Sequence, residues 1–72
     1  QYEKAIADYS KAIELNPKYA DAYTSRGDAY RKMEQYEKAL ADCSKAIELD
    51  PKEAGAYNVR GIAYKNLGQY EK

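Results

Sequence analysis

The sequence repeats itself every 34 residues. Residues 1–34 and 35–68 align without a gap and differ at 12 positions, so 22 are identical, and residues 69–72 (QYEK) begin a third copy. A period of this length is typical of architectures in which small units stack on one another, because one unit alone cannot bury its apolar face. A chain of 72 residues has room for a short stack and not for a second domain.

Each period predicts two helices. From Tyr2 to Ile13, apolar or small side chains recur at spacings of three and four residues, which places them on one face of a helix. Pro17 and Pro51 end this helix in each copy, because proline disfavours helical backbone in the residue before it. Around Pro51, an acid before and after it fits a capped start of the next helix, or a start a few residues later. We predict helices at residues 2–15, 20–33, 36–49 and 54–67, with residues 69–72 opening a fifth.

The second helix of each period carries a glycine inside its apolar face. Glycine there costs about 1 kcal/mol relative to alanine, so we expect Gly27 and Gly61 to allow close approach of a neighbouring helix carrying Ala5 or Ala39. The predicted buried positions are Tyr23, Gly27, Ala29, Tyr30 and Met33, and then Tyr57, Gly61, Ala63, Tyr64 and Leu67. Charges on the first helix are expected only to keep its outer face solvated. These are Glu3, Lys4, Asp8, Lys11 and Glu14.

The spacing of these residues resembles the signature of the tetratricopeptide repeat family. The signature falls on Tyr23, Gly27, Tyr30, Tyr36, Ala39, Ala46 and Pro51, and again on Tyr57, Gly61 and Tyr64. The sequence departs from it at Arg26 and Arg60, where the family often has leucine, and at Cys43, where it usually has an aromatic residue. Glu34 replaces a favoured glycine, so we expect it to adopt left-handed backbone at a helix end.

The resemblance implies an all-α fold of antiparallel helix-turn-helix repeats, stacked as a short right-handed α-solenoid. In this family's register, residues 1–19 are the second helix of one repeat, residues 20–53 are a complete repeat, and residues 54–72 are the first helix of the next repeat with the start of its second. Such a window leaves an apolar face open at each end. We therefore expect head-to-tail association between copies, in a contact that need not close.

The same resemblance implies a function in binding a protein or peptide segment. In the family the first helix of each repeat lines a concave groove, which here implies one stripe of candidate residues. They are Asp21, Thr24, Asp28, Arg31, Lys32, Asn58, Ile62, Lys65 and Asn66. Arg31, Lys32 and Lys65 could receive carboxylates, and Asp21 and Asp28 a basic or amide-rich segment. A subgroup of the family clamps acidic chaperone tails, but its pattern is poorly matched at Thr24, Asp28 and Ile62.

Other classes of function are less well supported. Twelve Lys and Arg balance twelve Asp and Glu, which disfavours a nucleic-acid partner, and the tyrosines recur at packing positions rather than as a stacking platform. The chain has no histidine, Cys43 lies on an apolar stripe, and Ser10 and Ser44 lack a partnered base, so we expect no enzyme, metal or cofactor. No apolar run could cross a membrane, and a single cysteine suits the cytoplasm. A consensus-like or excised repeat segment without a ligand of its own is the alternative.

Overall fold

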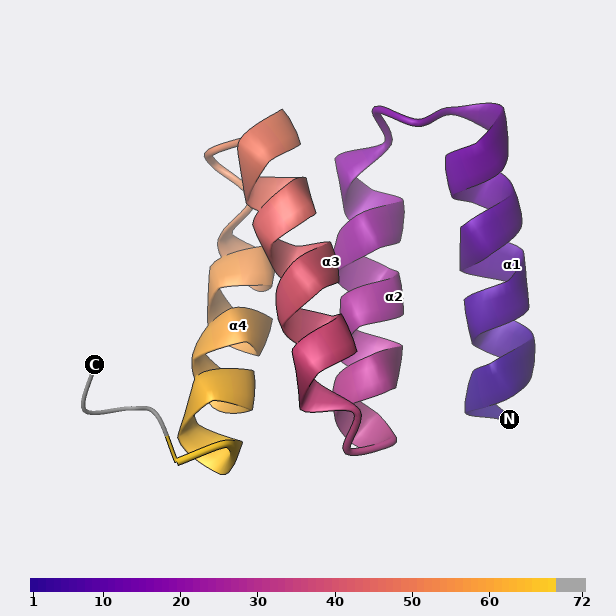
Figure 1. The fold of residues 1–72 in the computed structure, drawn as a ribbon. Helices are drawn as coiled ribbons and strands as arrows, with labels where there is room; N and C mark the ends of the chain where they lie inside the picture. Colours follow the sequence, from indigo (N-terminus) through magenta and orange to yellow (C-terminus); the bar gives the residue numbers. More distant parts are fainter. Residues whose placement is uncertain (69–72) are drawn as a thin grey trace.

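The computed structural model describes residues 1–68, which form four antiparallel helices lying side by side (Figure 1). The helices are α1 (Tyr2–Leu15), α2 (Ala20–Lys32), α3 (Tyr36–Leu49) and α4 (Ala54–Asn66). The predicted bounds of the first and third are confirmed, and α2 and α4 each end one residue earlier than predicted. The expected fifth helix falls on residues 69–72, outside the described residues. The described chain is therefore an all-α helical repeat, as the period predicts.

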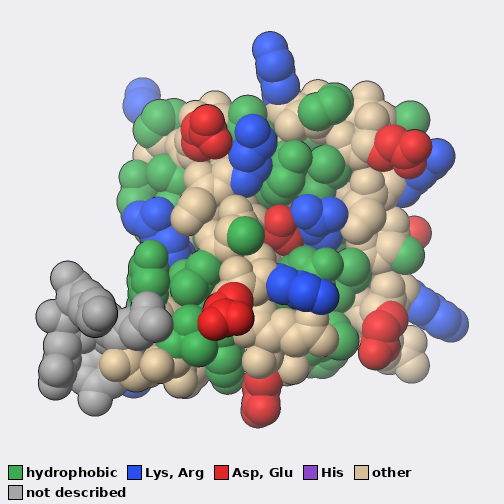
Figure 2. All heavy atoms as spheres, viewed as in Figure 1, with side chains coloured by type: hydrophobic (Ala, Val, Ile, Leu, Met, Phe, Trp, Pro, Cys, Tyr) green, Lys and Arg blue, Asp and Glu red, His purple; other side chains and the backbone are tan. Residues whose placement is uncertain are grey.

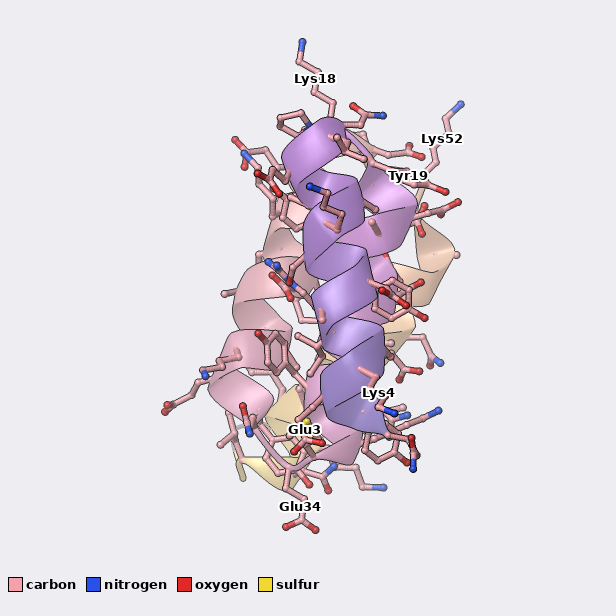
Figure 3. The ribbon with its side chains drawn as sticks, turned by 90° about the vertical axis from the view of Figure 1, so that its right-hand side faces the viewer. Glu3, Lys4, Lys18, Tyr19, Glu34 and Lys52 are labelled. Carbon is pink, nitrogen blue, oxygen red and sulfur yellow. The ribbon has the colours of Figure 1, made fainter. Side chains whose placement is uncertain are left out.

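The two turns that follow α1 and α3 are built alike. The side-chain oxygens of Asn16 and Asp50 accept the backbone amides of Lys18 and Lys52, at 3.2 and 3.1 Å. Asp50 thus closes α3, and α4 begins at Ala54, so the later of the two predicted starts is the one observed. Both turns lie at one end of the molecule, where Figure 3 labels Lys18 and Lys52, and Glu34 lies at the opposite end.

Glu34 closes α2 with left-handed backbone, as predicted. Its φ is 63°, and Gly68, one period later, has a φ of 75°. The amide of Gln35 donates to the carbonyl of Tyr30 at 2.9 Å, which satisfies one of the last carbonyls of α2. The chain therefore reverses direction at this turn, and α3 packs back on α2.

The core is made of small side chains. The buried apolar residues are Ala22, Ala29, Ala39, Cys43, Ala46, Ala56, Val59 and Ala63. A β-carbon added at Gly27 would lie 3.0 Å from the sulfur of Cys43 and 3.3 Å from the carbonyl oxygen of Ala39. This confirms that Gly27 allows α3 to approach α2 closely.

The same prediction is wrong for the last helix. On α4, Ala63 is buried and Leu67 half-buried, but Gly61 is exposed, and a β-carbon added there would meet nothing within 4 Å. Tyr57 and Tyr64 are 46% and 38% exposed. The pattern marks the face that a neighbouring helix would cover, and within residues 1–68 no helix packs on that side of α4.

The helices form two layers of unequal spacing. The backbones of α2 and α4 approach each other as well as α3, whereas within the described residues the backbones of α1 and α3 stay farther apart. Near the start of α4, an added β-carbon on Gly55 would lie 3.5 Å from the methyl group of Thr24, an ordinary contact distance. In a curved stack, the helices of the inner layer lie closer together than those of the outer layer. The α2 and α4 side is therefore the inner side of the stack.

Candidate functional site

On α2, the acidic and basic candidates are engaged with one another. Asp28 accepts hydrogen bonds from Nε and Nη2 of Arg31 at 2.9 and 2.7 Å, and Nζ of Lys32 lies 3.6 Å from its other oxygen. Residues three and four apart on a helix are neighbours, which accounts for both contacts. Asp28 is therefore not free to receive a basic group, and the three side chains together leave one net positive charge.

The candidates on α4 differ from their equivalents on α2. Asn58, Lys65 and Asn66 are exposed, and Ile62 is half-buried at the position where α2 has Asp28. Within the described residues Lys65 has no ion pair. The late turns of α2 and α4 thus carry a cationic cluster, which consists of Arg31, Lys32 and Lys65.

The opposite end of the molecule, at the two proline turns, holds three carboxylates. Asp21, Asp50 and Glu53 line an open hollow of about 400 Å³ between the two turns, beside Lys18. Burial raises the pKa of Glu53, and the nearby carboxylates of Asp21 and Asp50 raise it further. The Thr24 hydroxyl offsets part of this rise, although it makes no hydrogen bond of good geometry within residues 1–68. These three carboxylates form the acidic cluster.

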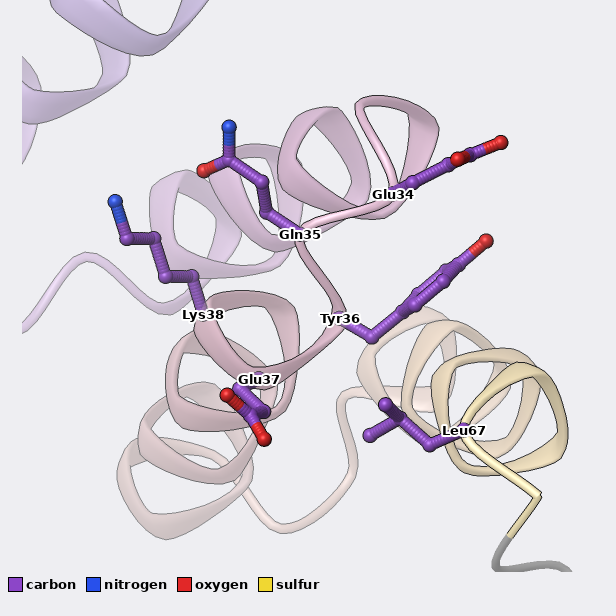
Figure 4. Close-up of a pocket in the computed structure, with 6 residues that line it drawn as sticks. All are labelled: Glu34, Gln35, Tyr36, Glu37, Lys38 and Leu67. Carbon is purple, nitrogen blue, oxygen red and sulfur yellow. The ribbon is translucent and has the colours of Figure 1, made fainter.

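A second hollow, of about 480 Å³, lies at the turn between α2 and α3. Figure 4 shows the side chain of Glu34 and the ring of Tyr36 pointing to the same side, with the side chain of Leu67 directed back toward Tyr36. Its remaining lining residues are Gln35, Glu37 and Lys38. None of the nine groove candidates lines this hollow, so it is separate from the predicted site.

A polar bridge that the sequence analysis missed joins three helices. Arg26 of α2 donates through Nε and Nη2 to the two oxygens of Asp42 of α3, both at 2.8 Å, and through Nη1 to the hydroxyl of Ser10 of α1 at 3.0 Å. The Asp42 hydrogen bond raises the pKa of Arg26. The signal was present in the sequence, since arginine, aspartate and serine each recur at the 34-residue period.

The residues weighed for catalysis have structural places. Cys43 is fully buried, and burial raises the pKa of its thiol from 9.0 to about 11, which keeps it protonated and unreactive. Ser10 accepts the Arg26 hydrogen bond, and Ser44 is exposed.

Among residues 1–68 no three acidic or cysteine side chains gather as metal ligands would, and no helix is long and apolar enough to span a membrane. On the face in Figure 2, basic and acidic side chains are interspersed.

Comparison with known proteins identifies the repeat. Two models described as tetratricopeptide repeat match residues 20–53 and 43–72, and one described as TPR repeat matches residues 1–33. A solved structure, the Arabidopsis OM64 TPR domain, superimposes with a TM-score of 0.96 at 37% identity. The match covers 99% of this chain and 59% of that chain, and no curated protein matches. The signature residues, the four-helix stack and these matches agree, and the chain belongs to the tetratricopeptide repeat family.

Proposed function

We propose that this chain binds an extended protein segment along the inner side of α2 and α4, by complementary charge at the two ends. Repeats of this family mediate contacts between proteins, so a binding role is the general expectation. The observation that carries the specific proposal is the separation of the acidic cluster from the cationic cluster along two helices that run in the same direction.

The distance between the clusters sets the length of the segment. Each helix has 13 residues and is about 20 Å long, a span that about six extended residues cover. Ile62 lies one turn before Lys65, between the clusters but nearer the cationic one, and offers an apolar contact there. The favoured partner carries basic residues at one end and carboxylates at the other, with an apolar side chain between. In this arrangement residues 20–53 act as one complete repeat and α4 as the first helix of the next.

Binding is tested with two labelled peptides of the same composition. One has its basic and acidic residues in separate blocks around a central leucine, and the other has them interspersed. Fluorescence anisotropy should detect tighter binding of the block peptide, weakening as salt is added because exposed charges are screened. Equal affinity for the two peptides would contradict the proposal.

Charge reversal locates the binding surface. Lys65→Glu and Asp21→Lys should each weaken binding of the block peptide by about tenfold, since a like-charge contact replaces an attractive one. Lys4→Glu on α1 is the matched control, because Lys4 is exposed on a helix that contacts α2 alone. Equal weakening by the control would show that net charge, and not this surface, governs binding.

We propose binding without catalysis because the side chains that could act as nucleophiles are buried or engaged in hydrogen bonds. The thiol of Cys43 is buried and the Ser10 hydroxyl accepts from Arg26. A free thiol of this kind persists in a reducing compartment, so we place the function in the cytoplasm. The alternative, a repeat segment with no ligand of its own, predicts that neither peptide binds.

A second proposed activity is head-to-tail association between copies. It is supported by the exposure of Tyr57 and Tyr64 on α4 and of Tyr2 on α1, at positions where the family's pattern predicts packing. Sedimentation equilibrium across a concentration series tests it. A mass that rises progressively above 8.2 kDa supports association, and a constant mass contradicts it.

A further inference from the structure

Asp28 lies among the cations of the inner side as an internal carboxylate. Nε and Nη2 of Arg31 donate to one of its oxygens at 2.9 and 2.7 Å, and Nζ of Lys32 lies 3.6 Å from the other. The side chains of Asp28 and Arg31 are 34% and 24% exposed, against 71% and 65% for the surface pair of Glu14 and Lys11. Solvent and salt therefore screen the Asp28 contacts less than they screen an ordinary surface pair.

These contacts leave one edge of the Arg31 guanidinium available. A guanidinium has five N–H donors, and Nε and Nη2 each give one to Asp28. Within residues 1–68 the edge between Nη1 and Nη2 makes no other side-chain hydrogen bond, and its fork geometry suits a carboxylate. A carboxylate of the partner that reaches this fork meets the negative charge of Asp28 on the adjacent edge. Repulsion by Asp28 therefore offsets the attraction of Arg31.

The next inner helix carries its cation without such a carboxylate. On α4, Lys65 is the equivalent of Arg31, and Ile62 is the equivalent of Asp28. The side chain of isoleucine has no charge and accepts no hydrogen bond, so the residue one turn before Lys65 does not offset its attraction for an anion. The inner side thus presents two equivalent cationic positions, and only the one on α2 is opposed by a carboxylate of its own helix.

We infer that Asp28 determines which helix receives the acidic end of the partner segment: it disfavours a carboxylate at Arg31 and Lys32 of α2 and directs it to Lys65 of α4. Like charges brought together across an interface cost free energy, and this cost fixes the register in which two partners bind. Without Asp28, the two cations of α2 outnumber the one on α4, and the acidic end should move to α2. The inference rests on the proposed function and names the residue that selects the register.

Removing the two lysines one at a time tests this selection, with the block peptide as ligand and fluorescence anisotropy as the measurement. In the unchanged chain, Lys65→Ala should weaken binding by about fivefold and Lys32→Ala by less than about twofold. In an Asp28→Asn background the order should reverse, because the carboxylate then pairs on α2. Asparagine keeps the shape of the side chain and removes only its charge, and circular dichroism checks that each variant keeps its helix content.

A second pair of variants tests the same effect on α4 and leaves α2 unaltered. Ile62→Asp places a carboxylate one turn before Lys65, as Asp28 stands before Arg31. Ile62→Asn is the matched control, since both variants lose the apolar contact and only one adds a charge. Ile62→Asp should bind the block peptide at least about fivefold more weakly than Ile62→Asn does.

The outcomes separate this inference from the proposed function. If the block peptide binds in preference to the interspersed peptide, but Lys65→Ala remains the more damaging change in the Asp28→Asn background, Asp28 does not select the register and the proposed binding stands. Equal binding of Ile62→Asp and Ile62→Asn would overturn the inference in the same way. If the two peptides bind the unchanged chain alike, both the proposed function and the role of Asp28 fail.

Discussion

Helices α2 and α4 carry the same arginine and glycine at equivalent positions, yet these two residues have opposite surroundings. On α2, Gly27 is buried under Cys43 and Arg26 is bound on both sides, by Ser10 and Asp42. On α4, Gly61 is open to solvent and Arg60 stacks only on its own tyrosine. The same local sequence is therefore a core in one place and a surface in the other. The neighbouring helix decides the role of each residue.

The largest test of this contrast is the pair of aspartates on α3 and α1. Asp42→Ala should destabilise the fold by about 3 kcal/mol, because it leaves the guanidinium of Arg26 half-buried and without its carboxylate. Asp8→Ala should change stability by less than about 0.5 kcal/mol, since Asp8 is exposed. Urea unfolding followed by circular dichroism measures both. Equal losses of stability would show that the contribution of each aspartate depends on its position in the repeat and not on the neighbouring helix.

A double variant separates the ion pair from the packing. Arg26→Leu with Asp42→Leu replaces both charges by apolar groups, and the family often has leucine at the position of Arg26. The double variant should lose less stability than Asp42→Ala alone, because no charge is left without a partner. A larger loss in the double variant would mean that the bridge to Ser10 contributes more than the pair.

The second test compares the thiol of Cys43 with its equivalent position on α1. Burial raises the pKa of Cys43 from 9.0 to about 11, so the folded chain holds the thiol proton more tightly than the unfolded chain. The resulting stability is fully present below pH 9 and is lost as pH rises through 11, by about 3 kcal/mol relative to Cys43→Ala. The free energy of unfolding is measured against pH for the unchanged chain and for Cys43→Ala. The difference between the two slopes cancels the titration of the tyrosines, which both chains contain.

A cysteine at the α1 position should behave differently. In the Cys43→Ala background, Tyr9→Cys places a thiol on a half-exposed face. This thiol should react with a thiol reagent at least tenfold faster than Cys43 does in the unchanged chain. A tenfold difference in rate means that burial protects Cys43 by about 1.4 kcal/mol. Similar rates in the folded state would show that Cys43 is not protected by α2 and α4.

The third test uses the two glycines. Gly27→Ala should destabilise the fold by about 1 kcal/mol, because overpacking against Cys43 and the Ala39 carbonyl outweighs the gain in helix propensity. Gly61→Ala should stabilise the monomer by up to about 1 kcal/mol, as in any open helix position. Thermal unfolding of dilute samples measures both. The same sign for both variants would contradict the contrast between α2 and α4.

Sequence reasoning succeeded where local rules decide the outcome. The prolines, the apolar spacing and the glycine inside α2 fixed the helix bounds to within one residue and the close approach at Gly27. The contacts of Asp28 with Arg31 and Lys32 also follow from spacing and could have been predicted.

It failed where the outcome depends on a neighbour. A charge on the outer face of an isolated helix reads as solvated, so the role of Asp42 was missed, although Arg26 and Ser10 recur with it in the repeat. The apolar pattern of α4 shows which face can be covered and not whether it is, which is why Tyr57 and Tyr64 were placed in the core. The groove stays a prediction for the same reason, since its partner is not part of the chain.

The smallest test compares the two residues that end α2 and α4. Glu34 has a φ of 63°, where a β-carbon is strained, and Gly68 reaches a φ of 75° without strain. Glu34→Gly should stabilise the fold by about 0.5 kcal/mol, because relief of strain exceeds the added flexibility of the unfolded chain. Gly68→Glu should lower the stability of the fold by less than Glu34→Gly raises it. No described helix follows α4, so no packing among the described residues depends on the backbone at Gly68. Differential scanning calorimetry resolves the two. A loss of stability in Glu34→Gly would mean that the turn between α2 and α3 is held by contacts of the Glu34 side chain, and not by backbone hydrogen bonds such as that from Gln35 to Tyr30.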